Sequence, residues 1–381
     1  MERATFENMK MRNKNLVLNY IRKNDGISRA EIAQQTGLTP PTVSSLVKVL
    51  LDENIIYESS IGASKGGRKP RLLKLNDEDN KVIGIYIGPK TLEAVVTNLR
   101  GDVESVEKHS IESSIDKKAL KTLIIDVIRH VMKPSHNYLG IGIAMHGFVD
   151  VETNTSLYAP LLLNIKGFNF NFITETFGIP IHVENDVRCK LWGEVSKIES
   201  DHNNIVYINL GHGVGGAIMI DGQLYNGSHN HAGEIGHSII EVNGRQCECG
   251  RKGCLQAYVS GLSIADSAQQ KKIISEGETA KELLRLADQG DVEAKAHIST
   301  IGTYLGTSIN NQMNMLDPDL IILGGGISNL YSHFKDELRK TIANENVSTN
   351  FGTPEIKIGE IKDSASSQGA ALLILEQIFN S

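Results

Sequence analysis

The chain has 381 residues, of which 40% are hydrophobic and 22% are charged, so it has the composition of a globular protein with room for two or three domains. No apolar run approaches the ~20 residues that span a bilayer, and the N-terminus has no apolar signal core, which argues against a membrane protein and predicts a cytoplasmic location. The net charge of −6 is unevenly distributed: residues 1–75 contain 13 Lys and Arg against 7 Asp and Glu, and the remainder contains 26 against 38. We therefore expect only the N-terminal part to meet a polyanion.

Residues 1–75 carry the signals of a helix-turn-helix domain. A first helix is predicted where apolar residues recur at helical spacing, at Leu16, Val17, Tyr20 and Ile21. Ser28 and Glu31 have the spacing of a capping box, which begins a short second helix that ends at Gly37. Thr39 and Pro40 suit the start of a third helix. Two short helices joined by a tight turn predict that the third helix enters the major groove of DNA.

The predicted DNA contacts lie on this helix and on a basic loop after it. On the helix they are the outward residues Thr39, Pro41, Thr42, Ser44, Ser45 and Lys48. Two strands, near residues 55–58 and 71–75, are expected to form a wing whose flexible tip places basic residues in a narrow minor groove: Lys65, Arg68 and Lys69. The alternative is a small helical dimerisation module with a solvated basic loop.

Residues 76–381 read as two similar blocks of strands and helices, 76–195 and 196–381. The first block has predicted strands at 82–88, 92–98, 139–144 and 181–184 and a helix at 117–132. The second has strands at 205–210, 216–220 and 320–323 and helices at 302–316 and 364–379. Each block opens with a strand-loop-strand unit, which suggests duplicated α/β lobes around a cleft. The C-terminal helix is expected to pack back on the first lobe.

A metal site is predicted where three of the four cysteines and a histidine fall within eighteen residues: His237, Cys247, Cys249 and Cys254. Three thiolates and one imidazole are a common closed set of ligands for structural Zn²⁺. Disulfides are disfavoured because the thiols of the cluster are odd in number and no secretory signal is present. The alternative is that these are ordinary buried thiols.

The G-E-I-G-H run from Gly233 and the C-x-C-G-x-x-G-C run from Cys247 resemble the signature of the ROK family of sugar kinases, sugar-responsive repressors and related open reading frames. The resemblance extends over roughly residues 80–381 and implies an actin-like, hexokinase-type fold for the two lobes. The N-terminal segment, through residues 27–30, 42–47 and 66–70, resembles the winged helix-turn-helix head of ROK repressors of the xylose-repressor type.

The resemblance also implies a sugar site. Asn185 and Asp186 match the family's E-N-D motif, in which both bind sugar hydroxyls and the Asp is also the base of the kinases. Glu234 and His237 match the sugar ligands of the G-E-x-G-H motif, where the His also coordinates zinc. Gln256 stands where family kinases commonly have Glu. The alternatives are that Asn185 is a turn residue and that Asp186 is a helix cap.

Both phosphate loops depart from the kinase pattern. Where family kinases have D-x-G-G-T, this chain has Tyr86-Ile87-Gly88-Pro89-Lys90, which lacks the metal-binding acid. Where they resemble G-T-G-x-G-G, it has Gly211-His212-Gly213-Val214-Gly215-Gly216. These changes predict that kinase activity is lost and that no catalytic residue remains, Asp186 being a vestige of the base.

The sequence therefore predicts a sugar-responsive transcriptional repressor. It would bind an inverted-repeat operator in double-stranded DNA as a homodimer or dimer of dimers, and its body would sense a monosaccharide or a derivative. Two alternatives stay open: an active ATP-dependent sugar kinase with an accessory DNA-binding head, and a constitutive DNA-binding protein whose sugar pocket no longer functions.

Overall fold

The structure, a computed structural model, describes residues 6–24, 26–61, 71–198, 202–345, 352–361 and 364–380. It divides into two compact units. The first comprises the residues up to Cys189 together with those from Ser366 onward, and the second is Lys190–Ala365. Within the first unit we call residues 6–75 the head and the rest the first lobe; the second unit is the second lobe.

The head is a winged helix-turn-helix domain, as the sequence predicts. Its helices are α1 (Phe6–Lys23), α2 (Arg29–Thr36) and α3 (Pro40–Asp52), and its sheet has the order β1-β3-β2, with β1 (Ile27–Ser28), β2 (Ile56–Ile61) and β3 (Arg71–Leu75). The capping box is present: the Ser28 hydroxyl accepts the N–H of Glu31 at 3.3 Å, and the Glu31 carboxylate accepts the N–H of Ser28 at 2.9 Å. Gly37, with φ of 71°, ends α2. The predicted first helix is confirmed, but Leu16 lies on its exposed side and Leu18 is buried in its place.

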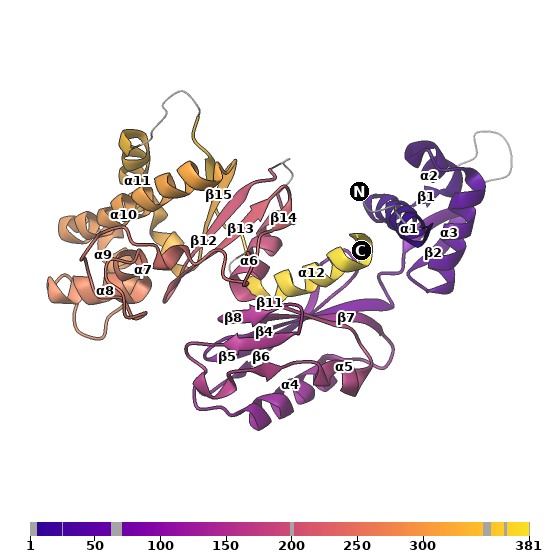
Figure 1. The fold of residues 1–381 in the computed structure, drawn as a ribbon, viewed down its shortest axis with the longest axis horizontal. Coiled ribbons are helices and arrows are strands. Elements are labelled where there is room, and N and C mark those ends of the chain that lie inside the picture. The colour runs from indigo at the N-terminus through magenta and orange to yellow at the C-terminus, as the bar shows by residue number, and fades with distance from the viewer. Residues whose placement is uncertain are drawn as a thin grey trace. The chain divides into compact units, whose positions relative to one another are not determined.

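The first lobe is a five-stranded sheet with helices on both faces. Its main sheet contains β4 (Asn80–Ile87), β5 (Thr91–Thr97), β6 (Val103–Ser110), β7 (Asn137–Met145) and β11 (Ile181–Asn185). A small second sheet contains β8 (Phe148–Asp150), β9 (Thr155–Tyr158) and β10 (Phe168–Asn169). The helical elements are α4 (Lys117–Val131), η1 (Leu163–Ile165), α5 (Phe172–Phe177), the start of α6 (Asp186–Val195), and α12 (Ala365–Asn380). Figure 1 shows α4 and α5 on one face of the main sheet and α12 on the other.

The second lobe contains a sheet of β12 (Ile205–Leu210), β13 (Val214–Ile220), β14 (Gln223–Leu224), β15 (Leu320–Gly324) and β16 (Glu355–Ile358). Its helical elements are η2 (Ile235–His237), α7 (Gln256–Val259), α8 (Gly261–Gln270), α9 (Ala280–Asp288), α10 (Val292–Leu316), η3 (Gly326–Leu330) and α11 (Tyr331–Glu345). The predicted helix at 302–316 is thus the second part of a helix that begins ten residues earlier.

The two main sheets have the same topology, which confirms the predicted duplication. In the first lobe β4 pairs antiparallel with β5 and parallel with β7, and in the second lobe β12 pairs antiparallel with β13 and parallel with β15. Written from the outer parallel strand, the orders are β11-β7-β4-β5-β6 and β16-β15-β12-β13-β14. In each lobe the carboxyl ends of the parallel strands meet at one edge of the sheet, where α/β proteins bind ligands.

Glycines let α12 lie directly on the first-lobe sheet. A Cβ on Gly84 would lie 1.9 Å from the carbonyl oxygen of Ser367, and one on Gly142 would lie 2.0 Å from that of Ala370. Such separations are far below van der Waals contact, so both strand positions require glycine. No side chain therefore separates α12 from the strands at these points.

Among the described residues, none of the helices combines the length and the apolar composition that a bilayer-spanning helix requires.

Candidate functional site

The candidate DNA contacts on α3 lie along one side of the helix. Thr39 is the N-cap, where its hydroxyl accepts the N–H of Thr42 at 3.4 Å, and the two hydroxyl oxygens are 2.8 Å apart. Thr42 is half-buried and takes part in this cap. The other candidates are exposed: Thr39, Pro41, Ser44, Ser45 and Lys48. Helix α3 is the second helix of the helix-turn-helix motif. Helix-turn-helix domains contact base edges and phosphates through polar side chains at the exposed N-terminal end of this helix, as are present here.

The wing is formed by β2 and β3, which pair antiparallel. Its tip, residues 62–70, lies outside the described residues, and so do the contacts predicted there: Lys65, Arg68 and Lys69. Below the tip, the Glu58 carboxylate pairs with Arg71 on β3 and with Arg29 on α2, the latter at 2.8 Å. The hydrogen bond from Arg71 lowers the pKa of Glu58. This pairing fastens the wing to the helix-turn-helix, so the two DNA-facing elements are held together.

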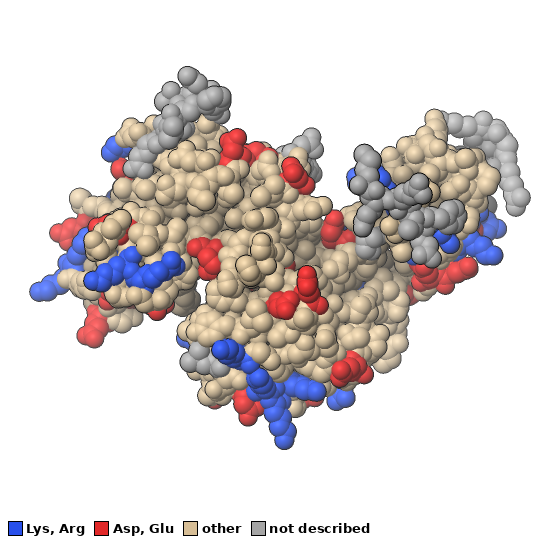
Figure 2. All heavy atoms as spheres, viewed as in Figure 1, with Lys and Arg blue, Asp and Glu red and all other residues tan. Residues whose placement is uncertain are grey.

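The two lobes present a mixture of charges. On the face that Figure 2 shows, acidic and basic side chains of the described residues are interspersed over the lobes without a continuous basic surface. The net acidity of residues 76–381 and the net positive charge of residues 1–75 favour the head as the part that meets a polyanion.

The structure brings the four predicted metal ligands together. The nitrogen or sulfur atoms of these side chains all lie within 4.8 Å of one another: His237, Cys247, Cys249 and Cys254. The Sγ atoms of Cys249 and Cys254 are 3.7 Å apart, and Cys247 Sγ is 3.8 Å from His237 Nδ1. A tetrahedron with Zn–S bonds of about 2.3 Å has sulfurs about 3.8 Å apart. The cluster therefore has the size and the donor set of a structural zinc site.

The G-E-I-G-H segment is pressed against β13 by its two glycines. A Cβ on Gly236 would lie 2.0 Å from the carbonyl oxygen of Val214, and one on Gly233 would lie 2.4 Å from a carbonyl oxygen of the same strand. Close contact with β13 fixes the short helix η2. Glu234 precedes η2 and is exposed, while His237 ends η2 and joins the cysteine cluster. Metal binding at His237 would thereby also position Glu234.

Asn185 and Asp186 lie where β11 ends and α6 begins. The Asn185 side-chain oxygen accepts the N–H groups of Val187 at 2.9 Å and Arg188 at 3.2 Å, as an N-cap does. Its side-chain nitrogen donates to the carbonyl of Gly147 at 2.8 Å. Asn185 thus has a structural role in addition to the expected contact with a sugar.

Asp186 is buried beside two aromatic side chains of the same lobe. Its Oδ2 atom lies 3.8 Å from Nδ1 of His146, the residue that follows β7. Burial raises the pKa of the Tyr86 hydroxyl, and the charges of Asp186 and Glu93 raise it further. Because β4, β7 and β11 run parallel, Tyr86, His146 and Asp186 lie near the carboxyl ends of three neighbouring strands.

A buried ion pair next to this edge was missed by the sequence analysis. Arg188 Nη1 and Glu184 Oε1 are 2.8 Å apart, and each side chain is 3% exposed. Glu184 lies in strand β11 and Arg188 in the following helix α6, so no single periodicity connects them. Opposite charges four residues apart were the only available signal.

Gln256 has a partner that was also not expected. Its side-chain oxygen accepts the N–H of Val214 at 3.1 Å, in the glycine loop formed by residues 211–216. One backbone donor of this loop is therefore already bound by a side chain of the same lobe. In an active kinase such donors are needed for nucleotide phosphate.

The first glycine turn is filled by an aromatic side chain. A Cβ on Gly88 would lie 2.2 Å from the hydroxyl oxygen of Tyr86. The phenol therefore occupies the space immediately beside the turn in which the kinases of the family hold phosphate. At the same turn Pro89 supplies no N–H donor.

Comparison with known protein families gives two matches. A model of the ROK family matches residues 82–377. A model of winged helix-turn-helix DNA-binding domains matches residues 12–57.

Individual relatives include both regulators and an enzyme. The xylose repressor of Bacillus spizizenii is 30% identical to the chain and the alignment covers 97% of this chain and 96% of the repressor. The DNA-binding transcriptional dual regulator NagC of Escherichia coli is 25% identical, over 79% of this chain and 77% of the regulator. The crystal structure of a ROK family transcriptional regulator, a homolog of the E. coli MLC protein, matches with a TM-score of 0.86 at 25% identity and covers 97% of this chain and 96% of its own. A ROK family glucokinase from Streptomyces griseus, in complex with glucose and AMPPNP, matches with a TM-score of 0.66 at 25% identity and covers 77% of this chain and 98% of its own.

Proposed function

We propose that this chain, which belongs to the ROK family, is a sugar-responsive transcriptional repressor. The observation that carries the proposal is the combination of a winged helix-turn-helix head with a kinase-like body whose first glycine turn is filled by Tyr86. The likeness to repressors extends over the head as well as the body. The likeness to the glucokinase leaves about a quarter of the chain unmatched.

The head binds double-stranded DNA through α3 and the wing. Exposed residues of α3, such as Ser44, Ser45 and Lys48, contact bases and phosphates in the major groove, and the wing-tip residues Lys65, Arg68 and Lys69 contact the minor groove. We infer a homodimer, or a dimer of dimers, because two such heads match an inverted repeat whose half-sites are ~34–36 Å apart or a multiple of it.

The body binds a monosaccharide or a derivative of one. The proposed ligands are Asn185 and Asp186 from the first lobe and Glu234, His237 and Gln256 from the second. Carboxylate, amide and imidazole groups suit hydroxyl recognition because an analogue that lacks a hydroxyl leaves a buried polar group unpaired. D-xylose is the first candidate, since the chain is similar over its length to xylose repressors. N-acetyl-D-glucosamine is the second, since the N-acetylglucosamine repressor of Escherichia coli O6:H1 is 25% identical to the chain.

Zinc has a structural part in this proposal. One Zn²⁺ would be held by His237, Cys247, Cys249 and Cys254. With all four positions filled by protein ligands, such an ion would stabilise the local structure and take no part in catalysis. The position of Glu234 would then be set by η2, which follows it in the chain and packs on β13.

We further propose that the body has lost kinase activity. Tyr86 occupies the space beside the first glycine turn, Pro89 lacks an N–H, and Gln256 binds a backbone donor of the second glycine loop. All three features oppose the close approach of nucleotide phosphate.

The test is a binding experiment with the full chain. An operator is selected from random duplex DNA, and its affinity is measured with and without D-xylose, D-glucose and N-acetyl-D-glucosamine. We expect at least one sugar to change operator affinity, Lys48→Ala to weaken DNA binding with a salt slope lower by about one unit, and Asp186→Ala to abolish the sugar response alone. Sugar-dependent ADP formation by the wild-type chain would favour the kinase alternative. Operator affinity that ignores every sugar would favour the constitutive DNA-binding protein.

A further inference from the structure

Helix α12 begins at one of the two places where the chain passes between the units. The chain leaves the first unit after Cys189 and returns to it at Ser366. A Cβ on Gly369 would lie 1.8 Å from the carbonyl oxygen of Cys189, so the first turn of α12 is in backbone contact with the residue at which the chain departs. The start of α12 is therefore fixed to both passages.

The helix then behaves as a rigid connector. It has 16 residues, which at 1.5 Å per residue gives a length of about 24 Å. Its contacts with Gly84 and Gly142 leave no compressible side chain between helix and sheet. A displacement at one end of such a helix is transmitted to the other end, because packed elements move as units and do not deform continuously.

The far end of α12 contacts the head. The side-chain nitrogen of Asn19, on α1, donates to the carbonyl of Phe379 at 3.0 Å and to the side-chain oxygen of Asn380 at 2.8 Å. The guanidinium of Arg22 lies over the ring of Phe379, 4.4 Å from its centroid, and this ring is fully buried. We call these four residues the head latch. Burial lowers the pKa of Arg22, and the nearby carboxylate of Glu376 opposes that effect.

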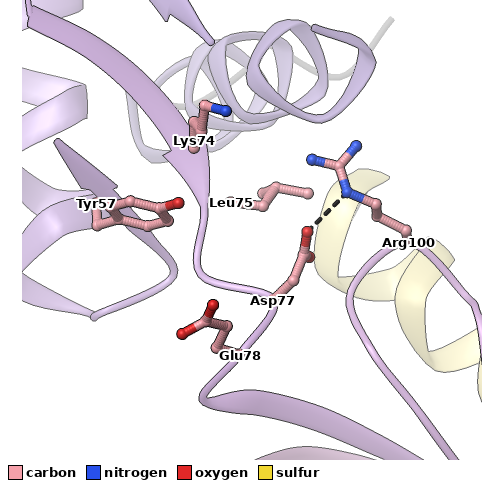
Figure 3. Close-up of a pocket in the computed structure, with 6 residues that line it drawn as sticks. All are labelled: Tyr57, Lys74, Leu75, Asp77, Glu78 and Arg100. Atoms are coloured by element: carbon pink, nitrogen blue, oxygen red, sulfur yellow. Dashed lines mark hydrogen bonds and ion pairs between the residues drawn. The ribbon is translucent and has the colours of Figure 1, made fainter. Parts of the chain in front are cut away.

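A second connection involves the segment that links the head to the first lobe. Arg100, in the turn between β5 and β6, pairs through Nε with the carboxylate of Asp77 at 2.7 Å. Asp77 belongs to the segment that leads from β3 of the head into the first lobe. The two side chains line a hollow of about 420 Å³ together with Tyr57 and Lys74 of the head. Figure 3 shows the ion pair and these neighbours. The head is thus held by the covalent linker, by the hydrogen bond that Asn80 of β4 donates to the Asn54 carbonyl of the head at 2.7 Å, and by the latch.

We propose that the head latch is the contact through which the sugar-bound state of the body reaches the DNA-binding head. The inference rests on the proposed function and adds the route: a change in the arrangement of the lobes acts on the start of α12, and the latch passes it to α1. Among the connections between the head and the first lobe, the latch is the one that α12 forms, so we expect the response to sugar to depend on it.

The test compares full-length variants in the operator assay above. Asn19→Ala removes two hydrogen bonds, and Phe379→Leu keeps an apolar side chain but removes the ring beneath Arg22. Gln377→Ala, at an exposed position of α12, is the matched control. With D-xylose as the first probe, or the panel sugar that gives the largest effect, we expect a wild-type response of about 5- to 150-fold in operator affinity. The response should fall below about twofold in both latch variants and stay unchanged in the control.

Two further measurements separate coupling from folding. Hydrogen exchange should become faster in residues 6–24 of the latch variants, while sugar affinity and the unfolding of the second lobe stay as in the wild type. If Asn19→Ala and Phe379→Leu open α1 to exchange yet respond to sugar as the wild type does, the latch is a structural contact only and the inference is wrong. A wild-type chain that ignores every sugar would instead contradict the proposed function itself.

Discussion

The two lobes share one strand order, and in each of them glycines allow another segment to approach the sheet closely. In the first lobe the segment is α12, which lies on Gly84 and Gly142, neighbours in the register of β4 and β7. In the second lobe it is the G-E-I-G-H segment, whose own Gly233 and Gly236 press it against β13. The first lobe thus supports a helix that reaches the head, and the second supports the loop that carries the metal cluster.

The difference indicates that the same sheet topology has two roles: in the first lobe it supports α12, and in the second lobe it supports the loop with the metal cluster. Destabilising substitutions in the first lobe should affect the contact between α12 and the head. Destabilising substitutions in the second lobe should affect metal binding and the position of Glu234. Because each lobe belongs to a different compact unit, we expect two unfolding transitions, each responding to substitutions in its own lobe.

The largest effect should come from the metal cluster of the second lobe. We expect Cys254→Ser to reduce zinc from about one ion per chain to nearly none and to lower the second-lobe melting temperature by roughly 10 °C or more, since a structural metal contributes several kcal/mol to folding. Elemental analysis and calorimetry measure both quantities. Cys189→Ala, a buried thiol outside the cluster, should retain zinc. A normal zinc content in Cys254→Ser would contradict the four-ligand assignment.

The buried ion pair of the first lobe should give the next largest effect. Arg188→Met removes the guanidinium that Glu184 contacts and should destabilise the first-lobe transition by about 3–5 kcal/mol. Urea unfolding with probes in each lobe would locate the change. The double variant Glu184→Gln with Arg188→Met should regain part of this loss. Equal destabilisation of single and double variants would show that the buried carboxylate is not the cause.

The close packing of α12 on the first-lobe sheet can be tested by adding a single methyl group. Gly142→Ala should destabilise the first lobe by about 1–3 kcal/mol, because its Cβ would collide with the carbonyl of Ala370. Gly326→Ala, where a Cβ would meet nothing within 4 Å, should change stability by less than about 0.5 kcal/mol. Denaturant midpoints measure both variants. The close packing of α12 would be refuted if the two substitutions proved equally harmless.

The smallest effect should come from the contact between Gln256 and the glycine loop. Gln256→Ala removes the acceptor of the Val214 N–H and should destabilise only the second lobe, by about 1 kcal/mol, with zinc retained. Gln270→Ala, on the surface of α8, is the control and should be neutral. If Gln256→Ala instead lowered only the stability of the first lobe, the expectation that each lobe responds to substitutions in its own residues would be wrong.

Sequence patterns were sufficient where the interacting residues are close in the chain. The capping box of Ser28 and Glu31 spans four residues, and the four metal ligands span eighteen, so spacing alone restricts their positions. The exposed side of α3 followed from helical periodicity for the same reason. The duplication of the lobes could be predicted because each of them opens with a strand-loop-strand unit, whereas the strand order came from the structure.

The remaining features depend on the tertiary fold. Gln256 and Val214 are 42 residues apart, and Asn19 and Phe379 are 360 apart, so no local pattern marks either contact. The first turns of α10 were missed because their buried side begins with Ala294 and His297, and large apolar residues follow only at Ile298 and Ile301. Periodicity of hydrophobic side chains is the signal for a helix, and here it is weak.

The cap at Asn185 has a consequence for how loss-of-function mutants are interpreted. Helix α6, which Asn185 caps, continues from the first unit into the second, since Cys189 and Lys190 are consecutive residues within it. An alanine at position 185 would therefore remove a proposed sugar ligand and fray, at a cost of about 1 kcal/mol, the helix that both units share. Asn185→Asp keeps the capping oxygen and removes only the amide donor. If Asn185→Asp fails to respond to sugar, the failure is evidence for lost sugar recognition. If Asn185→Ala fails to respond, the cause can also be the weakened start of helix α6.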